Sequence, residues 1–359
     1  MGKIVLKILL LFTLLWGISF AVRSYLDLPF HWGNEGWNVK YEWFKEHSTE
    51  YNTLFLGSSH IYRHINPQVF DRQFGKTANV RSFNLGYQAT YNPEVYVLFE
   101  EMLNDPELDL SSLKLLVMDL TPVEWMRLGN ARSVRGKYYT DIPTWWRTVK
   151  QVNQSERGSS GGRFDIMSHY TISLFEKEFN VGMYDEYLEH LTTPRRAVTG
   201  KEKFMGPQQN GFLPLNRDPA FRFRRQKFLD CQQYLVPMSA VNTQYYYECT
   251  VAQEQSAAPA APALHAAAQR LIDMAADKGI YLLFVVMPRS PYKESAPLEA
   301  IFPEGQVINM TDPREYPEFY DLDYVYDRGH LNQKGARVAS VKLGRKVNQL
   351  MKQNIIPKP

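Results

Sequence analysis

Three residue types that together can perform nucleophilic catalysis stand near opposite ends of the chain. Ser59 lies in the segment GSSH at 57–60, and Asp327 and His330 lie in the segment DRGHLN at 327–332. A serine hydroxyl needs a base to remove its proton, and the base needs a carboxylate that fixes its tautomer and stabilises the imidazolium. The pattern therefore predicts Ser59 as nucleophile, His330 as base and Asp327 as the acid that orients the base.

Each half of this pattern also has a purely structural interpretation. Glycine and serine are common turn residues, so GSSH alone fits a turn without chemistry. Asp327 or Asn332 could cap the helix expected after residue 332, which would leave His330 on the surface. Catalysis is favoured because the two halves together supply nucleophile, base and acid.

Two further positions could support the reaction. Gly86 ends the segment Asn84-Leu85-Gly86, and a glycine there allows its backbone N–H, with that of Ser59, to form an oxyanion hole. His60 adjoins the nucleophile and could bind an acyl donor or a polymer, although a solvent-facing histidine at a helix start is the alternative. Neither His60 nor His64 has a partner at a metal-binding spacing, so we expect no metal and no cofactor.

The elements that must position these residues alternate between strands and helices. Apolar runs predict strands, and the first two end on Gly57 and Gly86. The expected strands are 53–56, 80–85, 113–120, 280–287 and 307–310. One helix is expected to begin near Asn92 and Pro93, and two further helices are expected at 264–278 and at 332–351.

This alternation predicts an α/β fold, a three-layer α/β/α sandwich whose parallel sheet has about five strands in the order 2-1-3-4-5. Ligands bind such sheets outside the carboxyl ends of the strands, where Ser59 would lie. We assign residues 51–125 and 262–359 to this domain. Residues 126–261 interrupt the rhythm with a Ser/Gly loop and an Ala/Pro linker, which predicts an inserted cap or lid.

In order and spacing, the motifs resemble those of the SGNH/GDSL hydrolase superfamily. In that superfamily a Gly-Asp-Ser block after the first strand supplies the nucleophile. A Gly after the second strand and an Asn after the third complete the oxyanion hole, and a C-terminal Asp-x-x-His supplies acid and base. By this resemblance Ser59 is the nucleophile, Gly86 is the second-block glycine, and Asp327 with His330 forms the last block.

The sequence departs from that superfamily at two blocks. Ser58 stands where the first block has Asp, and the third strand is followed by DLTPVEW at 119–125 in place of a Gly-x-Asn-Asp block. The usual Asn donor of the oxyanion hole is therefore replaced, with Thr121 as the candidate substitute.

These departures, with an N-terminal anchor, resemble the D protein of the D-alanyl-lipoteichoic acid pathway and, more loosely, alginate O-acetylation proteins. Members of those families work outside the membrane beside a membrane-bound O-acyltransferase. The resemblance implies an acyl donor, an envelope glycan or teichoic-type polymer as acceptor, and such a membrane partner.

The N-terminus has the character of a membrane segment. Residues 4–22 are apolar except for Lys7 and span 19 residues, close to the roughly 20 that cross a bilayer. Lys3 and Lys7 precede the main apolar run, which favours a cytoplasmic N-terminus and an exported catalytic domain. We expect residues 1–23 to be a single-pass anchor, or alternatively a cleaved signal peptide, and residues 24–50 to be a connector.

Composition limits the remaining possibilities. Lys and Arg number 41 against 38 Asp and Glu, so no broad basic surface exists for nucleic acid. The aromatic content of 14% fits stacking on sugars, and it equally fits a hydrophobic core. Cys231 and Cys249 could form a disulfide in an oxidising compartment or remain reduced.

The expected function is therefore acyl-ester chemistry on an envelope polymer, with transfer favoured over hydrolysis by resemblance alone. An O-acetylesterase would use the same residues. The alternative from another class is a non-catalytic assembly protein that binds glycan or a membrane partner. A distance above about 6 Å between His330 and Ser59 would favour that alternative, because proton transfer needs hydrogen-bond reach or one bridging water.

Overall fold

The computed structural model describes residues 2–26, 35–75, 79–120, 128–154, 160–184, 187–188, 201–230, 262–288, 302–327 and 329–358. The chain forms two compact units. Unit 1 contains Met1–Asn38 and Met126–Thr199, and unit 2 contains Val39–Trp125 and Gly200–Pro359.

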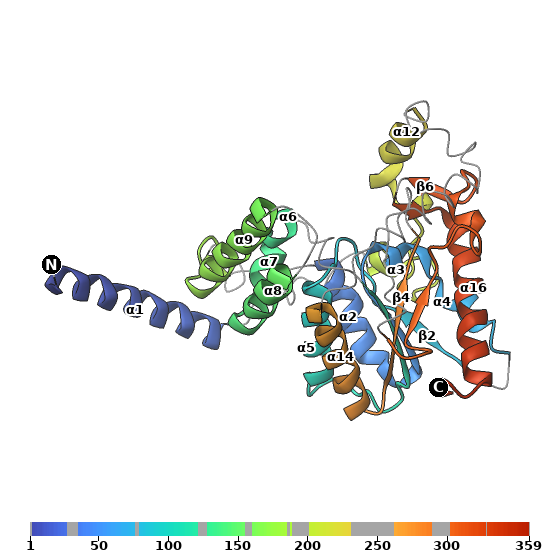
Figure 1. Ribbon diagram of the computed structural model, residues 1–359, viewed down its shortest axis with the longest axis horizontal. Helices are drawn as coiled ribbons and strands as arrows, with labels where there is room; N and C mark the ends of the chain where they lie inside the picture. The colour runs from blue at the N-terminus through green and yellow to red at the C-terminus, as the bar shows by residue number, and fades with distance from the viewer. Residues whose placement is uncertain are drawn as a thin grey trace. The chain divides into compact units, whose positions relative to one another are not determined.

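Unit 2 is built on a five-stranded sheet (Figure 1). In sheet order the strands are β2 (Ser82–Asn84), β1 (Thr53–Leu56), β3 (Leu115–Asp119), β4 (Tyr281–Val286) and β5 (Val307–Asn309). All four pairings are parallel. The predictions of an α/β fold, a five-stranded parallel sheet and the strand order 2-1-3-4-5 are thus confirmed.

Burial explains why these short segments form strands. Every residue of β1, β2 and β3 is buried. A parallel sheet with both faces covered needs such nearly continuous apolar runs. The register places Leu54 of β1 beside Phe83 of β2 and Leu116 of β3. The carboxyl ends of β1 and β3 therefore lie next to each other.

Helices cover the sheet in Figure 1, with α5 and α14 on one side of the strands and α4 and α16 on the other. Among its described residues, unit 2 has the helices α2 (Glu35–His47), whose first residues belong to unit 1, α3 (Ser59–His64), α4 (Pro67–Asp71), α5 (Glu94–Asn104), α11 (Lys201–Met205), α12 (Arg222–Asp230), α14 (Pro262–Asp277) and α16 (Gln333–Lys352). The 3-10 turns are η2 (Ser48–Glu50), η4 (Leu215–Arg217), η5 (Pro219–Phe221) and η6 (Pro317–Tyr320).

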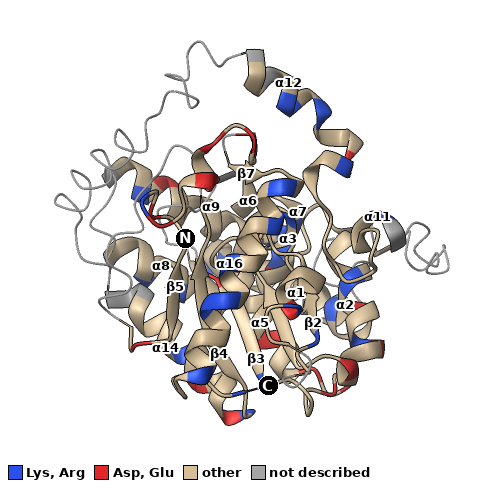
Figure 2. Ribbon diagram, turned by 90° about the vertical axis from the view of Figure 1, so that its right-hand side faces the viewer, with Lys and Arg blue, Asp and Glu red and all other residues tan. Residues whose placement is uncertain are grey.

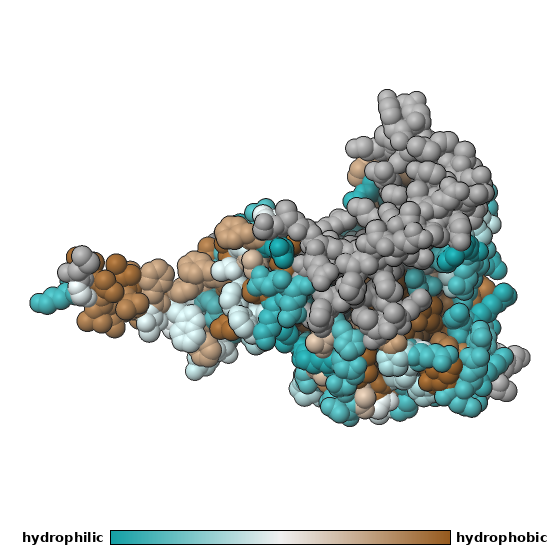
Figure 3. Space-filling model, in the orientation of Figure 1, coloured by the Kyte–Doolittle hydropathy of each residue, from teal (hydrophilic) through white to brown (hydrophobic). Residues whose placement is uncertain are grey.

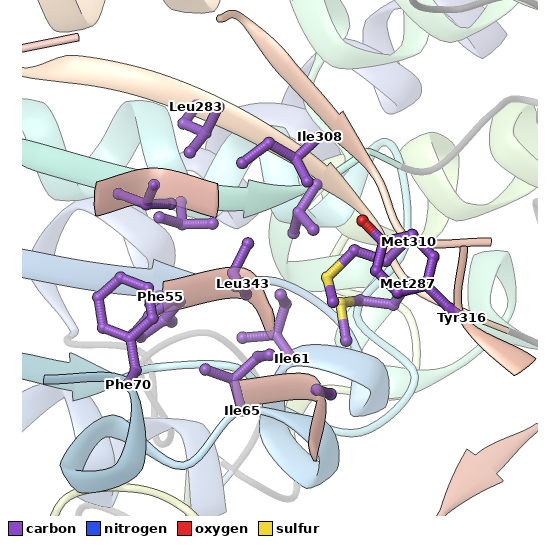
Figure 4. Close-up of a cluster of buried hydrophobic side chains, with 14 of the residues drawn as sticks. Phe55, Ile61, Ile65, Phe70, Leu283, Met287, Ile308, Met310, Tyr316 and Leu343 are labelled. Atoms are coloured by element: carbon purple, nitrogen blue, oxygen red, sulfur yellow. The ribbon is translucent and has the colours of Figure 1, made fainter. Parts of the chain in front are cut away.

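The largest core cluster joins the sheet to α3, α4 and α16. Figure 4 shows Phe55 and Leu283 from the strands close to Ile61, Phe70 and Leu343 from the helices, all fully buried. This packing fixes α3, whose first residue is Ser59, against the end of the sheet.

A two-stranded antiparallel ribbon carries the C-terminal motif. β6 (Val325–Asp327) pairs with β7 (His330–Leu331), and Asp327 lies opposite His330. The sequence pattern predicted no strand between residues 310 and 332.

Unit 1 contains α1 (Gly2–Tyr25), α6 (Leu128–Ala131), α7 (Val134–Tyr139), α8 (Ile142–Gln154) and α9 (Ser160–Glu178). Helix α1 is long and apolar enough to cross a membrane, with a mean hydropathy of 2.3 in its most apolar window. By length and composition it fits a membrane anchor or a signal sequence.

Two segments differ from their sequence-based description. Residues 24–50, expected to be a connector, contain α2, whose Tyr41 and Phe44 are fully buried. In the interrupting segment 126–261, residues 128–154 and 160–178 contain helices of unit 1, whereas 201–230 belong to unit 2. The role of this segment as a cap stays a prediction. Cys231 and Cys249 lie outside the described residues.

Candidate active site

Ser59 lies where β1 turns into α3. Between them, Gly57 adopts a φ of 154°, and a Cβ atom there would lie 2.5 Å from Cβ of Asp119. Only glycine fits this approach, because no Cβ contact is so short. Ser58 caps α3 by accepting a hydrogen bond from the backbone N–H of His60 at 3.2 Å. Ser59 therefore begins the helix in a fixed position, 8% exposed.

The three predicted catalytic residues lie in hydrogen-bond contact although 271 positions separate Ser59 from His330. Nε2 of His330 lies 2.9 Å from Oγ of Ser59, and its Nδ1 lies 2.8 Å from Oδ1 of Asp327. A carboxylate only accepts hydrogen bonds, so Nδ1 carries the proton and Nε2 is left to accept from the serine hydroxyl. The separation is well inside the 6 Å limit set by the need for proton transfer.

The carboxyl group of Asp327 is held in its charged form. Burial alone would raise its pKa, but the hydrogen bond and charge of His330, the N–H of Gly329 and the charge of Arg224 together hold the pKa below its ordinary value. The N–H of Gly329 donates to the same Oδ1 atom at 2.8 Å. Asp327 can therefore stabilise a positive charge on His330 while it fixes the ring.

The structural alternative for Asp327 does not apply, because another residue caps the last helix. Oδ1 of Asn332 accepts the N–H groups of Lys334 and Gly335 at 2.9 and 3.0 Å and so caps α16. From outside, Arg225 of α12 donates to the carbonyl groups of Val325 and Tyr326 at 3.1 and 3.0 Å. Figure 2 shows the basic residues along α12.

Two histidines of α3 hold the backbone on both sides of His330. Nε2 of His60 lies 2.9 Å from the carbonyl oxygen of Gly329, so it donates there. The N–H of Leu331 donates to Nε2 of His64 at 3.0 Å, so that nitrogen carries no proton. We call His60 and His64 the histidine clamp. It joins the helix that begins with Ser59 to the strand that carries His330.

The clamp is connected to the end of β3. Oγ of Ser58 donates to Oδ2 of Asp119 and lies 3.3 Å from Nδ1 of His60. Asp119 is 1% exposed, and its carboxylate lies 4.0 Å from the same ring nitrogen. His60 was predicted to bind an acyl donor or a polymer. It is 3% exposed, and its ring is hydrogen-bonded within the protein.

The N–H of Gly86 has an acceptor within the protein. It donates to Oδ1 of Asn84 at 2.9 Å. The amide nitrogen of Asn84 donates to the carbonyl groups of Ile61 and Ile65 at 2.8 and 2.7 Å and so satisfies the end of α3. The role of Gly86 as oxyanion donor stays a prediction, since this N–H would have to leave Asn84. Thr121 lies outside the described residues.

Lys40 is a residue that sequence reasoning missed. It is fully buried, and its ammonium donates to the carbonyl groups of Gly86 and Gly211 at 2.5 and 2.9 Å. It also lies 4.1 Å from the centre of the Tyr62 ring. Burial, followed by the charge of Arg63, lowers its pKa well below the ordinary value. Lysine is seldom buried, so no sequence pattern marked this one.

Within the described residues, no group of three His, Cys, Asp or Glu side chains is arranged to hold a metal ion. The three imidazoles near Ser59 have ring centres 5.2 to 5.9 Å apart. At least two of their Nε2 atoms are engaged by backbone groups, as described above.

No protein-family model and no curated protein matches the chain. The chemistry of the site must therefore be argued from its own geometry. Three groups of this site can together generate a nucleophilic alkoxide. They are an oriented carboxylate, a histidine whose Nε2 carries no proton, and a serine at the start of a helix.

Proposed function

We propose that the chain is a serine acyltransferase or esterase of the SGNH type, with a three-layer α/β/α domain that acts on acyl esters of an envelope polymer. The observation that carries the proposal is the contact of His330 with both Ser59 and Asp327. The nucleophile begins α3, whereas the base and the orienting acid lie opposite each other on the β6–β7 ribbon. Hydrogen-bond contacts in the order Ser59, His330, Asp327 are hard to explain by a structural role alone.

In the proposed reaction, Oγ of Ser59 attacks the acyl carbon as its proton moves to Nε2 of His330. Asp327 stabilises the imidazolium that forms. The N–H of Ser59, at the start of α3, faces the developing oxyanion, with Gly86 and Thr121 as the candidate second donors. His330 then protonates the leaving group, and a polymer hydroxyl or water removes the acyl group from Ser59.

The setting follows from resemblance and from α1. In this proposal residues 1–23 anchor the chain in the membrane, the catalytic domain lies on the extracytoplasmic side, and residues 126–261 cover the site. The acyl donor would come from, or be shared with, a membrane-bound O-acyltransferase. The acceptor would be a polysaccharide or a teichoic-type polymer.

The test is labelling of the full chain in detergent with a fluorophosphonate, followed by mass mapping of the labelled peptide. We expect labelling on Ser59 that disappears in Ser59→Ala and His330→Ala. The variant His169→Ala, a histidine of α9 in unit 1, should label as the wild type does. No label on a wild type with normal circular dichroism would contradict the proposal.

A second measurement separates transfer from hydrolysis. An esterase releases free acid at full rate without glycan, whereas a transferase needs the acceptor. One observation favours the non-catalytic alternative, a glycan-binding or partner-binding scaffold: the N–H of Gly86 already has an acceptor. Unlabelled but folded protein that still binds an envelope glycan would support that alternative.

A further inference from the structure

Exposed apolar side chains are concentrated in unit 1. Among the described residues, unit 2 exposes only Phe223 and Leu229 as large apolar side chains. Outside α1, the described part of unit 1 exposes nine: Val134, Ile142, Trp146, Phe164, Ile172, Phe175, Val181, Tyr184 and Leu188. A concentration of this kind marks a surface that contacts a partner or a membrane.

The most regular part of this surface is a stripe along α9. Phe164, Ile172 and Phe175 are 66%, 40% and 48% exposed. At 100° per residue they project on one side of the helix, roughly opposite the buried Tyr170 and Ser173. We call Phe164, Ile172 and Phe175 the α9 stripe.

The α9 stripe is continuous with the apolar surface of α1. The ring of Phe175 lies 4.6 Å from that of Phe179, which meets Phe12 of α1 edge-on at 5.9 Å. Figure 3 shows the hydrophobic surface of α1 together with hydrophobic areas on the adjoining helices. Whatever contacts the exposed side of α1, lipid or protein, therefore also contacts the C-terminal end of α9.

Polar bonds fix α1 to α9 at a definite level. Arg23 donates to the carboxylate of Glu178 and to the carbonyl of Lys177, both at 2.8 Å. Nε1 of Trp16 donates to the same carboxylate at 3.0 Å. These bonds make the last turns of α1 a part of unit 1. Tryptophan and arginine are also typical of the membrane–water interface.

The length of α1 sets the depth of this contact. A helix of 24 residues spans about 36 Å, slightly more than the roughly 30 Å of the bilayer core. If α1 crosses the bilayer, the level between Phe12 and Arg23 corresponds to one leaflet and its headgroups. The C-terminal end of α9 lies beside that level.

We propose that the α9 stripe rests in the surface of the lipid bilayer beside α1, as a second, peripheral membrane contact. The described residues from 128 to 184 contain seven Lys and Arg against four Asp and Glu, a balance that suits anionic headgroups. Lipid is favoured over a protein because the stripe adjoins α1, whose length and composition fit a membrane anchor. The inference rests on the proposed anchoring of the chain by α1. This inference does not depend on the chemistry of Ser59.

The test is spin-label accessibility in the full chain, reconstituted as single copies in nanodiscs of phosphatidylcholine and phosphatidylglycerol. Cys231 and Cys249 are replaced by Ser, and labels are placed by Phe164→Cys or Phe175→Cys. Leu10→Cys, on the exposed side of α1, is the lipid control. Gln349→Cys, exposed on α16, is the water control, and circular dichroism confirms folding.

We expect labels at 164 and 175 to collide more often with oxygen, which concentrates in lipid, than with a water-soluble nickel complex, as at position 10. Preferential collision with the nickel complex, as at position 349, would overturn the proposal. Labels shielded from both reagents would also overturn it, because protein would then cover the stripe.

Discussion

The histidine clamp makes a prediction that separates positioning from general packing. His64→Leu replaces the imidazole with an apolar side chain of similar size, so Leu331 loses the acceptor of its N–H. Leu331 is 2% exposed and directly follows His330. A buried N–H without an acceptor costs about 1–3 kcal/mol.

The strand can avoid this cost only by moving its backbone toward other acceptors or water, which draws His330 away from Ser59. If the whole cost destabilises the arrangement in which His330 contacts Ser59, the population of that arrangement drops about 5- to 150-fold, at 1.36 kcal/mol per factor of ten. The rate of fluorophosphonate labelling should drop by the same factor.

The assay is the single-turnover labelling rate of the full chain at neutral pH. His64→Gln is the matched variant, because its Oε1 can accept the N–H of Leu331 from nearly the position of Nε2. We expect His64→Gln to recover most of the labelling rate that His64→Leu loses, and the two variants to have equal melting temperatures. Labelling of His64→Leu within twofold of the wild type would show that His64 does not position His330.

Three further predictions follow from other contacts. Asp327→Asn removes the charge that stabilises the imidazolium and allows the wrong tautomer of His330. Fluorophosphonate labelling should therefore slow about 10³- to 10⁴-fold, with little change in melting temperature. A loss below tenfold would exclude Asp327 as the orienting acid. Burial raises the pKa of Asp71 to about 6, above its ordinary 3.8, so the folded state binds the proton more tightly and loses stability as pH rises from about 4 to 6. The melting temperature of Asp71→Asn should therefore gain on that of the wild type between about pH 4 and pH 6. A constant difference would show that Asp71 does not titrate in this range. In Gly86→Ala the new Cβ would lie 2.6 Å from the backbone nitrogen of Tyr62, so α3 must shift; we expect a loss of about 1–3 kcal/mol in stability, measured by urea unfolding, and an unchanged midpoint would contradict the close approach.

The sheet could be predicted because its strands are short, apolar and fully buried. Runs such as Thr53–Leu56 and Leu115–Asp119 leave few alternatives to a parallel strand, and Gly57 ends the first one where no Cβ fits. The alternation of these runs with helices then restricts the topology. The strand order followed from those rules without any knowledge of side-chain contacts.

Helix α2 could not be predicted in the same way. Its sequence mixes aromatic, charged and polar residues, so periodicity is weak, and Lys40 lies on its buried side. The sequence gives no sign that two backbone carbonyls and an aromatic ring will surround that lysine. The burial of Lys40 is decided by tertiary packing that brings Gly211 beside Gly86.

The candidate site was predictable in its residue types and not in its supporting contacts. Ser59, Asp327 and His330 are recognisable because their chemistry is complementary. The bond from Leu331 to His64 joins positions 267 residues apart, which no local pattern reveals. The spacing of His60 and His64 by four residues did place both on one side of a helix that starts with Ser59, and that signal could have been used.

Detection of an acyl-enzyme would test most directly whether Ser59 is a nucleophile activated by His330. The full chain is mixed with 4-nitrophenyl acetate, stopped in acid, digested and analysed by mass spectrometry. We expect one acetyl group on the peptide that contains Ser59, formed with a burst of nitrophenol and absent in His330→Ala. A burst without acetylation of Ser59, or equal acetylation in His330→Ala, would contradict a serine nucleophile activated by His330.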